Sequence, residues 1–167
     1  DIVAPCLLHH LALAQAHRLF PEATVWGVEG FRQKRPDIAW THTLTEASWP
    51  YKATLDLVCL EGIPQLNECV FFHRSSKTLI VGDLCFNLHR PTGWAAPIAL
   101  RLLGNYDRFA ISRSFWFFVK NKARFKHSVA KIFEWDFERI AMSHGEVIEK
   151  DGKSLLKKAL QASGLLF

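Results

Sequence analysis

Apolar residues fall along the chain in short runs that polar or glycine-containing turns separate. Runs of four to six residues rich in Val, Ile, Leu and Phe are typical of buried strands. On this basis we predict strands over 1–5, 24–28, 55–60, 69–73, 78–81 and 138–142. The runs 69–73 and 78–81 flank the turn residues 74–77 and predict an antiparallel hairpin.

Longer segments with helical periodicity lie between these strands. They predict helices over 7–20, 94–103, 114–119, 121–135 and 151–166, with Asn121 as a cap and Gly104 as a stop. Residues 30–36 read as a short helix or loop, and residues 41–52 as a surface connection. Alternating elements together with a hairpin predict an α/β (α+β) protein with mixed sheets.

Length and composition limit the class of protein. The 167 residues suit a single domain, and an apolar fraction of 49% excludes general disorder. The apolar runs are interrupted well before the roughly 20 residues that a membrane span needs. Since the first residues also lack a basic segment followed by an apolar one, we expect neither a span nor a signal peptide.

The four cysteines lie far apart in apolar segments and form no CxxC pair, which argues against a zinc ribbon or redox motif. We therefore expect Cys6, Cys59, Cys69 and Cys85 to be reduced core residues of a cytoplasmic protein. If one of them faces a site, Cys85 is the first candidate.

The net charge of +5 is concentrated in one segment. Between Arg101 and Lys131 there are eight basic residues and one acidic residue, Asp107, an excess of seven positive charges. The densest cluster, a candidate anion-binding surface, is Lys120, Lys122, Arg124 and Lys126. The alternative is a solvated helix face, and in the absence of a nucleic-acid motif we do not expect nucleic acid as a partner.

Three of the predicted strands are followed by side chains that can bind a metal. His9 and His10 follow the first strand, Asp83 follows 78–81, and His144 follows 138–142. Strand ends at one edge of a sheet form the crevice in which ligands bind, so these groups are expected to converge. A buried carboxylate such as that of Asp83 needs a cation or several hydrogen-bond donors.

Each of these residues also has a structural interpretation. A histidine pair alone is a weak signal, and Asp83 can instead cap a loop by accepting from backbone N–H groups. His73 also ends a strand, but the turn after it suggests the opposite, solvent-facing edge. Trp49, Tyr51, Phe86 and Trp94 can line a pocket, although aromatic residues in such positions usually belong to the core.

Three segments resemble a known family: APCLLHHLALAQAHRLFP (4–21), VFFHRSSKTLIVGDLCF (70–86) and WDFERIAMSHGEVI (135–148). They are similar to a divergent, uncharacterised branch of the metallo-β-lactamase fold superfamily, over nearly the whole chain. The resemblance implies an αββα sandwich. It also implies that His9 and His10 correspond to the last two residues of the HxHxDH motif, Asp83 to the bridging aspartate and His144 to the late ligand.

The sequence departs from that family in two respects. The first two histidines of the motif would fall at Pro5 and Leu7, and residues 62–68 lack the histidine that usually precedes the strand-end aspartate. We therefore expect one divalent ion (Zn, Mn or Fe) or none, with His9, His10, Asp83 and His144 as candidate ligands. The chain also enters directly at the histidine loop, so we expect the N-terminal strands of the fold to be missing.

Two functions follow from the resemblance. The first is a metal-dependent hydrolase for a small-molecule ester, thioester or phosphoester, with Asp83 holding or orienting the attacking water. The second is a catalytically inactive member that binds an anionic ligand or a partner. A nuclease-like activity is a weaker third reading that rests on the basic segment.

Overall fold

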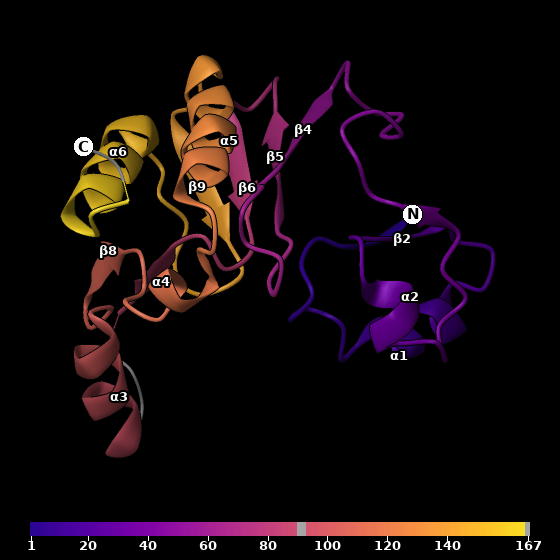
Figure 1. Cartoon of the computed structure of the whole chain (residues 1–167), viewed down its shortest axis with the longest axis horizontal. Coiled ribbons are helices and arrows are strands. Elements are labelled where there is room, and N and C mark those ends of the chain that lie inside the picture. Colours follow the sequence, from indigo (N-terminus) through magenta and orange to yellow (C-terminus); the bar gives the residue numbers. More distant parts are fainter. Residues whose placement is uncertain (90–92, 166–167) are drawn as a thin grey trace.

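A computed structural model describes residues 1–89 and 93–165 (Figure 1). The N-terminal sheet contains β1 (Ile2–Ala4), β2 (Val25–Gly27) and β3 (His42–Thr43), all parallel. The helices α1 (Leu13–Leu19) and α2 (Phe31–Lys34) make the connections between them. This sheet and its helices form one side of the molecule (Figure 1).

A four-stranded sheet occupies the centre, in the order β4 (Leu55–Cys59), β5 (Cys69–His73), β6 (Thr78–Val81) and β9 (Arg139–Met142). The pairs β4–β5 and β5–β6 are antiparallel, whereas β6 and β9 are parallel. The predicted hairpin and the predicted mixed sheet are therefore confirmed. Because Val81 pairs with Met142, the residues that follow these two strands leave the sheet at the same edge.

The remaining elements lie on the far side of the four-stranded sheet. They are α3 (Ala95–Leu103), α4 (Phe115–Phe118), α5 (Lys122–Glu134), α6 (Gly152–Ala162) and a two-stranded sheet of β7 (Phe86–Leu88) and β8 (Arg108–Ala110). As predicted, Asn121 caps α5 through its side chain, and Gly104 ends α3 in the left-handed conformation that glycine permits.

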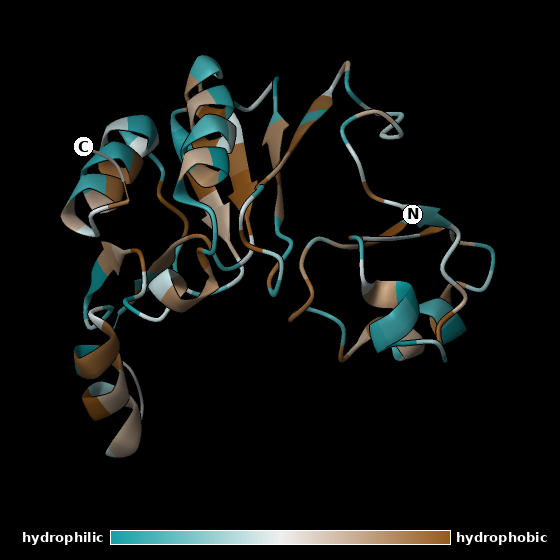
Figure 2. Cartoon of the chain, viewed as in Figure 1, coloured by the Kyte–Doolittle hydropathy of each residue, from teal (hydrophilic) through white to brown (hydrophobic). Residues whose placement is uncertain are grey.

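The central sheet is buried on both faces. Leu57 and Phe71 pack with the core of the N-terminal sheet, while their neighbours Val58 and Phe72 pack against α5 and α6. Because successive side chains of a strand point to opposite faces, both positions must be apolar, and the central strands are accordingly brown in Figure 2. The layers are thus helices, sheet, sheet and helices, the αββα order that the resemblance implies.

Several sequence-based boundaries were wrong. The predicted helix over 7–20 begins only at Leu13, because the chain between β1 and α1 makes turns. The predicted surface connection 41–52 contains β3 and the buried residues Leu44 and Trp49. The strands β7 and β8 were not predicted, since three-residue strands show too little alternation to be recognised.

The cysteine prediction needs correction. Cys59 and Cys69 are directly opposite each other in the β4–β5 register and form a disulfide, so they are not reduced. Strand pairing brings together two residues that the sequence spaces ten apart. Cys6 and Cys85 are free and buried, as expected.

None of the helices within residues 1–89 and 93–165 combines the length and the apolar composition that crossing a bilayer requires.

Candidate metal centre

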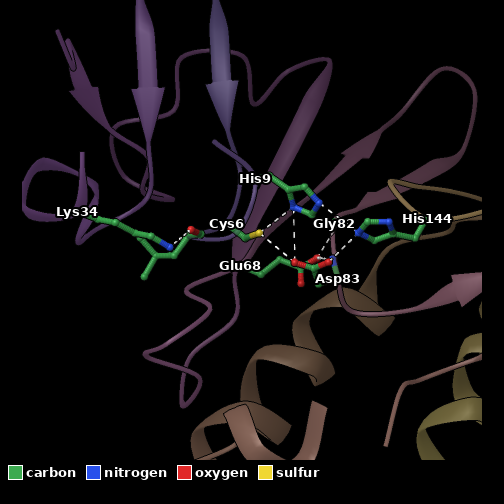
Figure 3. A network of polar contacts seen from close by, with 8 residues as sticks. Cys6, His9, Lys34, Glu68, Gly82, Asp83 and His144 are labelled. Carbon is green, nitrogen blue, oxygen red and sulfur yellow. Dashed lines mark hydrogen bonds and ion pairs between the residues drawn. The ribbon is translucent and has the colours of Figure 1, made fainter. Parts of the chain in front are cut away.

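Three of the four predicted ligands, His9, Asp83 and His144, meet where the ends of strands from both sheets come together (Figure 3). Cys6 and His9 lie in the turn segment after β1, Asp83 follows β6 and His144 follows β9. Two backbone hydrogen bonds, Leu7 N to Leu66 O (2.8 Å) and Cys69 N to Pro5 O (2.7 Å), fix the turn segment against the central sheet. The centre therefore depends on how the two sheets are joined.

Cys6, His9 and Asp83 converge on one point. The Cys6 Sγ atom lies 2.9 Å from His9 Nδ1 and donates to Asp83 Oδ2 at 3.2 Å, and His9 Nδ1 lies 3.5 Å from the same oxygen. In a tetrahedral zinc site with bonds of 2.0–2.3 Å, ligand atoms are about 3.3–3.7 Å apart. The three donors thus need to move only a few tenths of an ångström to hold an ion, and their chemistry suits one.

His144 approaches the other side of the same carboxylate. Its Nε2 atom lies 3.1 Å from Asp83 Oδ1 and 3.3 Å from His9 Nε2. Its ring is stacked on Phe86, with centroids 5.2 Å apart, and its carbonyl accepts from Asn87 N. The His144 side chain is 42% exposed, against 12% for Asp83, so the centre opens to solvent on the His144 side.

The structure does not place His10 with these residues. His10 Nδ1 lies 2.9 Å from Arg35 Nη1, and the ring packs edge-on against Phe31. Burial, followed by the charges of Lys34 and Arg35, lowers the pKa of His10. The adjacent histidines point to different neighbours, and only His9 faces Asp83.

Glu68 holds the backbone at Asp83 in place, and nothing in the sequence indicated this role. This fully buried residue accepts hydrogen bonds through Oε1 from Gly82 N (2.7 Å) and Asp83 N (3.1 Å). The loop-capping role considered for Asp83 is thus carried out by Glu68. A side chain at Gly82 would lie 3.3 Å from Glu68 Oε1 and 3.5 Å from His9 Nδ1, so glycine keeps these two groups close.

The electrostatics of the centre favour a cation. Burial and then the charge of Asp83 raise the pKa of Glu68 to about 8, and burial with the charges of Asp83 and Glu68 raises the pKa of the Cys6 thiol well above its usual value. Within the part of the chain that the structure describes, Glu68 Oε2 has no hydrogen-bond partner, and neither Asp83 nor Glu68 pairs with Lys or Arg. Acidic groups buried in this way fit a bound metal ion.

Cys6 is the second residue that sequence reasoning missed. It stands between Pro5 and Leu7, the two positions at which the family motif would place its first histidines. The available signal was its position three residues before His9, a spacing that lets a turn bring both side chains to one point. Cys85, the cysteine favoured by the sequence, is fully buried in the core, and burial, followed by the charge of Glu68, raises its pKa.

An apolar hollow of about 390 Å³ lies beside the centre. His9 and His10 line it together with Val3, Leu8, Leu11, Ala12, Leu13 and Ala16. The hollow can therefore accommodate the apolar part of a ligand next to His9.

The predicted anion-binding surface lies at the start of α5 and remains a prediction. Lys120, Lys122 and Arg124 are exposed, and Lys122 Nζ lies over the ring of Trp116, 4.1 Å from its centroid. Lys126 lines a groove between α5 and α6 with Phe133, Lys153 and Lys157.

No protein-family model and no curated protein sequence matches the chain. Solved structures do match it. The DIM-1 metallo-β-lactamase has a TM-score of 0.59 at 12% identity, over 97% of this chain and 67% of that one. The same enzyme exposed to ceftazidime gives 0.57 at 10% identity, over 96% and 67%.

A metallo-β-lactamase from Pontibacter korlensis has a TM-score of 0.53 at 13% identity, over 90% of this chain and 62% of its own length. At 10–13% identity such likeness shows the fold alone. The chain therefore has the metallo-β-lactamase fold that the three sequence segments predicted.

Proposed function

We propose that the protein is a hydrolase that uses one divalent metal ion held by Cys6, His9 and Asp83. The observation that carries this proposal is the convergence of these three donor atoms at the sheet edge, within hydrogen-bonding distance of a solvent-facing histidine. Three protein ligands with an open fourth position are the pattern of a catalytic metal site. The thiolate of Cys6 favours zinc or iron over manganese.

The residues around the site have separable roles. Cys6, His9 and Asp83 would hold the ion, which when bound would supply a water of lowered pKa and a Lewis acid for the substrate carbonyl. The Asp83 carboxylate faces Cys6 through Oδ2 and accepts from His144 through Oδ1, which orients the His144 ring. His144 lies on the open side. Because its Nε2–H donates to the Asp83 carboxylate, its other ring nitrogen, Nδ1, would accept a proton from the attacking water and return it to the leaving group.

The neighbouring hollow supports a substrate class. Because its lining is apolar apart from the two histidines, it suits the acyl part of a carboxylic ester or thioester better than a sugar or a nucleotide. Within this proposal, the apolar group would lie over Val3, Leu8 and Leu11 with its carbonyl directed toward His9.

The metal content of the purified protein tests the proposal. We expect about one zinc or iron ion per chain by elemental analysis, loss of that ion in Asp83→Ala and His9→Ala, and retention in His10→Ala. His10 is a matched control because it is the adjacent histidine and faces Arg35 instead of Asp83. A protein that takes up no ion at micromolar zinc, or a His10→Ala variant that loses metal as His9→Ala does, would contradict the proposal.

A second candidate, a binding module without catalysis, is favoured by one observation. Pro5 and Leu7 stand where the family motif has its first two histidines, and neither side chain can bind a second ion. His144→Ala separates the candidates. If the protein is a hydrolase, His144→Ala should keep the metal and lower turnover of acyl thioesters or p-nitrophenyl esters by about 100-fold or more. If it is a binding module, neither the unchanged protein nor His144→Ala should turn over these substrates.

A further inference from the structure

The helix α3 exposes a stripe of large apolar side chains. Trp94 is 83% exposed, Ile98 52% and Leu102 71%, and their spacing of four residues places them along one face. No side chain between Ala95 and Leu103 is buried. Figure 1 shows α3 projecting away from the sheets, and in Figure 2 much of its ribbon has the brown colour of hydrophobic residues. Trp94, which we expected in the core or a pocket, is instead a surface residue.

A cationic hollow of about 500 Å³ adjoins the end of this helix. Its walls include the apolar residues Phe109, Ile111, Trp116, Leu155 and Ala159, and its basic residues are Arg108, Arg113 and Lys158. Two of these basic residues are attached to α3: Arg108 Nε donates to Gly104 O at 2.8 Å, and Arg113 Nη1 donates to Leu102 O at 3.2 Å. The apolar stripe and the positive charges therefore form one continuous region of the molecule.

The positive charges of this region are not neutralised by the protein. Within residues 1–89 and 93–165, none of Arg108, Arg113 and Lys158 forms an ion pair with a carboxylate. The nearby Asp107 is paired with His89 at 2.8 Å. An anionic group that approaches the hollow would thus meet three cations, and no acidic residue is among the described residues that line it.

We propose that this region binds the surface of an anionic phospholipid bilayer. The stripe of Trp94, Ile98 and Leu102 would enter the boundary between headgroups and acyl chains, while Arg108, Arg113 and Lys158 would bind lipid phosphates. Helices with Trp and Leu on one face and basic residues beside them bind bilayers in this way, and basic residues near an anionic surface add to the affinity.

Two other partners fit less well. Nucleic acid would engage the arginines but would leave the apolar stripe in water. A second copy docked on the stripe would cover the apolar side chains but would leave Arg108, Arg113 and Lys158 without an anionic partner. A lipid surface satisfies both the apolar stripe and the charges.

Flotation with vesicles tests the inference. Full-length protein would be mixed with vesicles of phosphatidylcholine alone or with about 30% phosphatidylserine, at low and high salt. We expect binding to the anionic vesicles, weakened about tenfold or more at high salt or without phosphatidylserine. Equal binding to both vesicle types, or binding to neither, would overturn the inference.

Matched variants locate the surface. Trp94→Ser with Ile98→Ser and Leu102→Ser should weaken binding about tenfold or more, because apolar burial is lost, and Arg113→Gln with Lys158→Gln should do the same. The controls are Leu19→Ser with Phe20→Ser, which are similarly exposed at the end of α1, and Lys52→Gln with Lys150→Gln. Unfolding temperatures would verify that each variant is folded.

Two results would overturn the assignment to lipid. One is vesicle binding by the α3 variant as strong as that of the unchanged protein. The other is a dimer in solution, seen by light scattering, that the α3 variant alone dissociates, because the stripe would then be covered by a second copy. Metal content and hydrolysis should not change in the α3 variant, so the test is independent of the proposed function.

Discussion

At the scale of single residues, Glu68 is the side chain on which the geometry of the centre depends most. It is fully buried, and one of its oxygens holds two successive backbone N–H groups, those of Gly82 and Asp83. This fixes the direction in which the Asp83 side chain leaves β6. A residue that binds no substrate therefore determines where the candidate metal ligand points.

Two replacements of Glu68 should distinguish how much its shape and how much its hydrogen bonds contribute to the free energy of unfolding. Glu68→Leu leaves two buried N–H groups without an acceptor, each costing about 1–3 kcal/mol, so we expect a clear drop in the free energy of unfolding by urea denaturation. Glu68→Gln keeps an acceptor oxygen in the same place and should lose much less. Equal losses in both variants would show that the hydrogen bonds are unimportant.

Gly145 should be similarly sensitive, for a different reason. Its φ is +122°, and a Cβ there would lie 2.1 Å from Asn87 O, on the segment that positions His144. We expect Gly145→Ala to cost about 3 kcal/mol or more through strain and displacement. Gly93→Ala is the control, since its φ is +79° with no atom within 4 Å of the added Cβ. Equal unfolding temperatures for Gly145→Ala and Gly93→Ala in a thermal melt would contradict this.

Part of the centre was readable in the sequence. His9, Asp83 and His144 all lie in segments that follow predicted strands, and the parallel pairing of β6 with β9 places Asp83 Oδ1 and His144 Nε2 3.1 Å apart. Cys6 and Glu68 were missed because each resembles an ordinary residue of its segment: a cysteine among apolar residues, and a glutamate in a loop. Only the tertiary structure shows that both are buried beside Asp83.

At the scale of elements, strong local signals located most strands and helices. The cap at Asn121 and the stop at Gly104 fixed α5 and α3 almost to the residue. Boundaries failed where tertiary contacts decide the conformation. The segment before α1 is held by hydrogen bonds to the central sheet, and β7 is held by β8 and by the bridge from Asn87 to Gly145. A single sequence does not contain that information in its local pattern.

The cap of α5 gives a prediction at this scale. Asn121 Oδ1 accepts from Arg124 N at 3.1 Å, which satisfies one free donor of the first turn. Asn121→Ala should lower the free energy of unfolding by about 1 kcal/mol, whereas Asn121→Asp keeps the acceptor and should be close to neutral. The measurement is urea denaturation, and an unchanged midpoint for Asn121→Ala would show that the cap contributes nothing.

At the scale of the whole molecule, the disulfide between β4 and β5 is open to a direct check. Cys59 and Cys69 are bonded, and Cys6 and Cys85 are free. Denatured, unreduced protein should therefore show two reactive thiols, and reduced protein all four. Four thiols without reduction would restore the expectation of a fully reduced chain and, with it, an argument for a cytoplasmic location.

The way the centre is assembled links it to the stability of the whole molecule. Cys6 and His9 come from the N-terminal sheet, and Asp83 comes from the central one. An ion bound to all three would link the N-terminal sheet to the central sheet, because the three ligands lie together only while the two sheets are packed against each other. At 100 times its dissociation constant it would add about 2.7 kcal/mol to the free energy of unfolding. Removal of the metal by a chelator should thus lower the unfolding temperature and increase hydrogen exchange at the junction of the sheets, even in a variant without turnover.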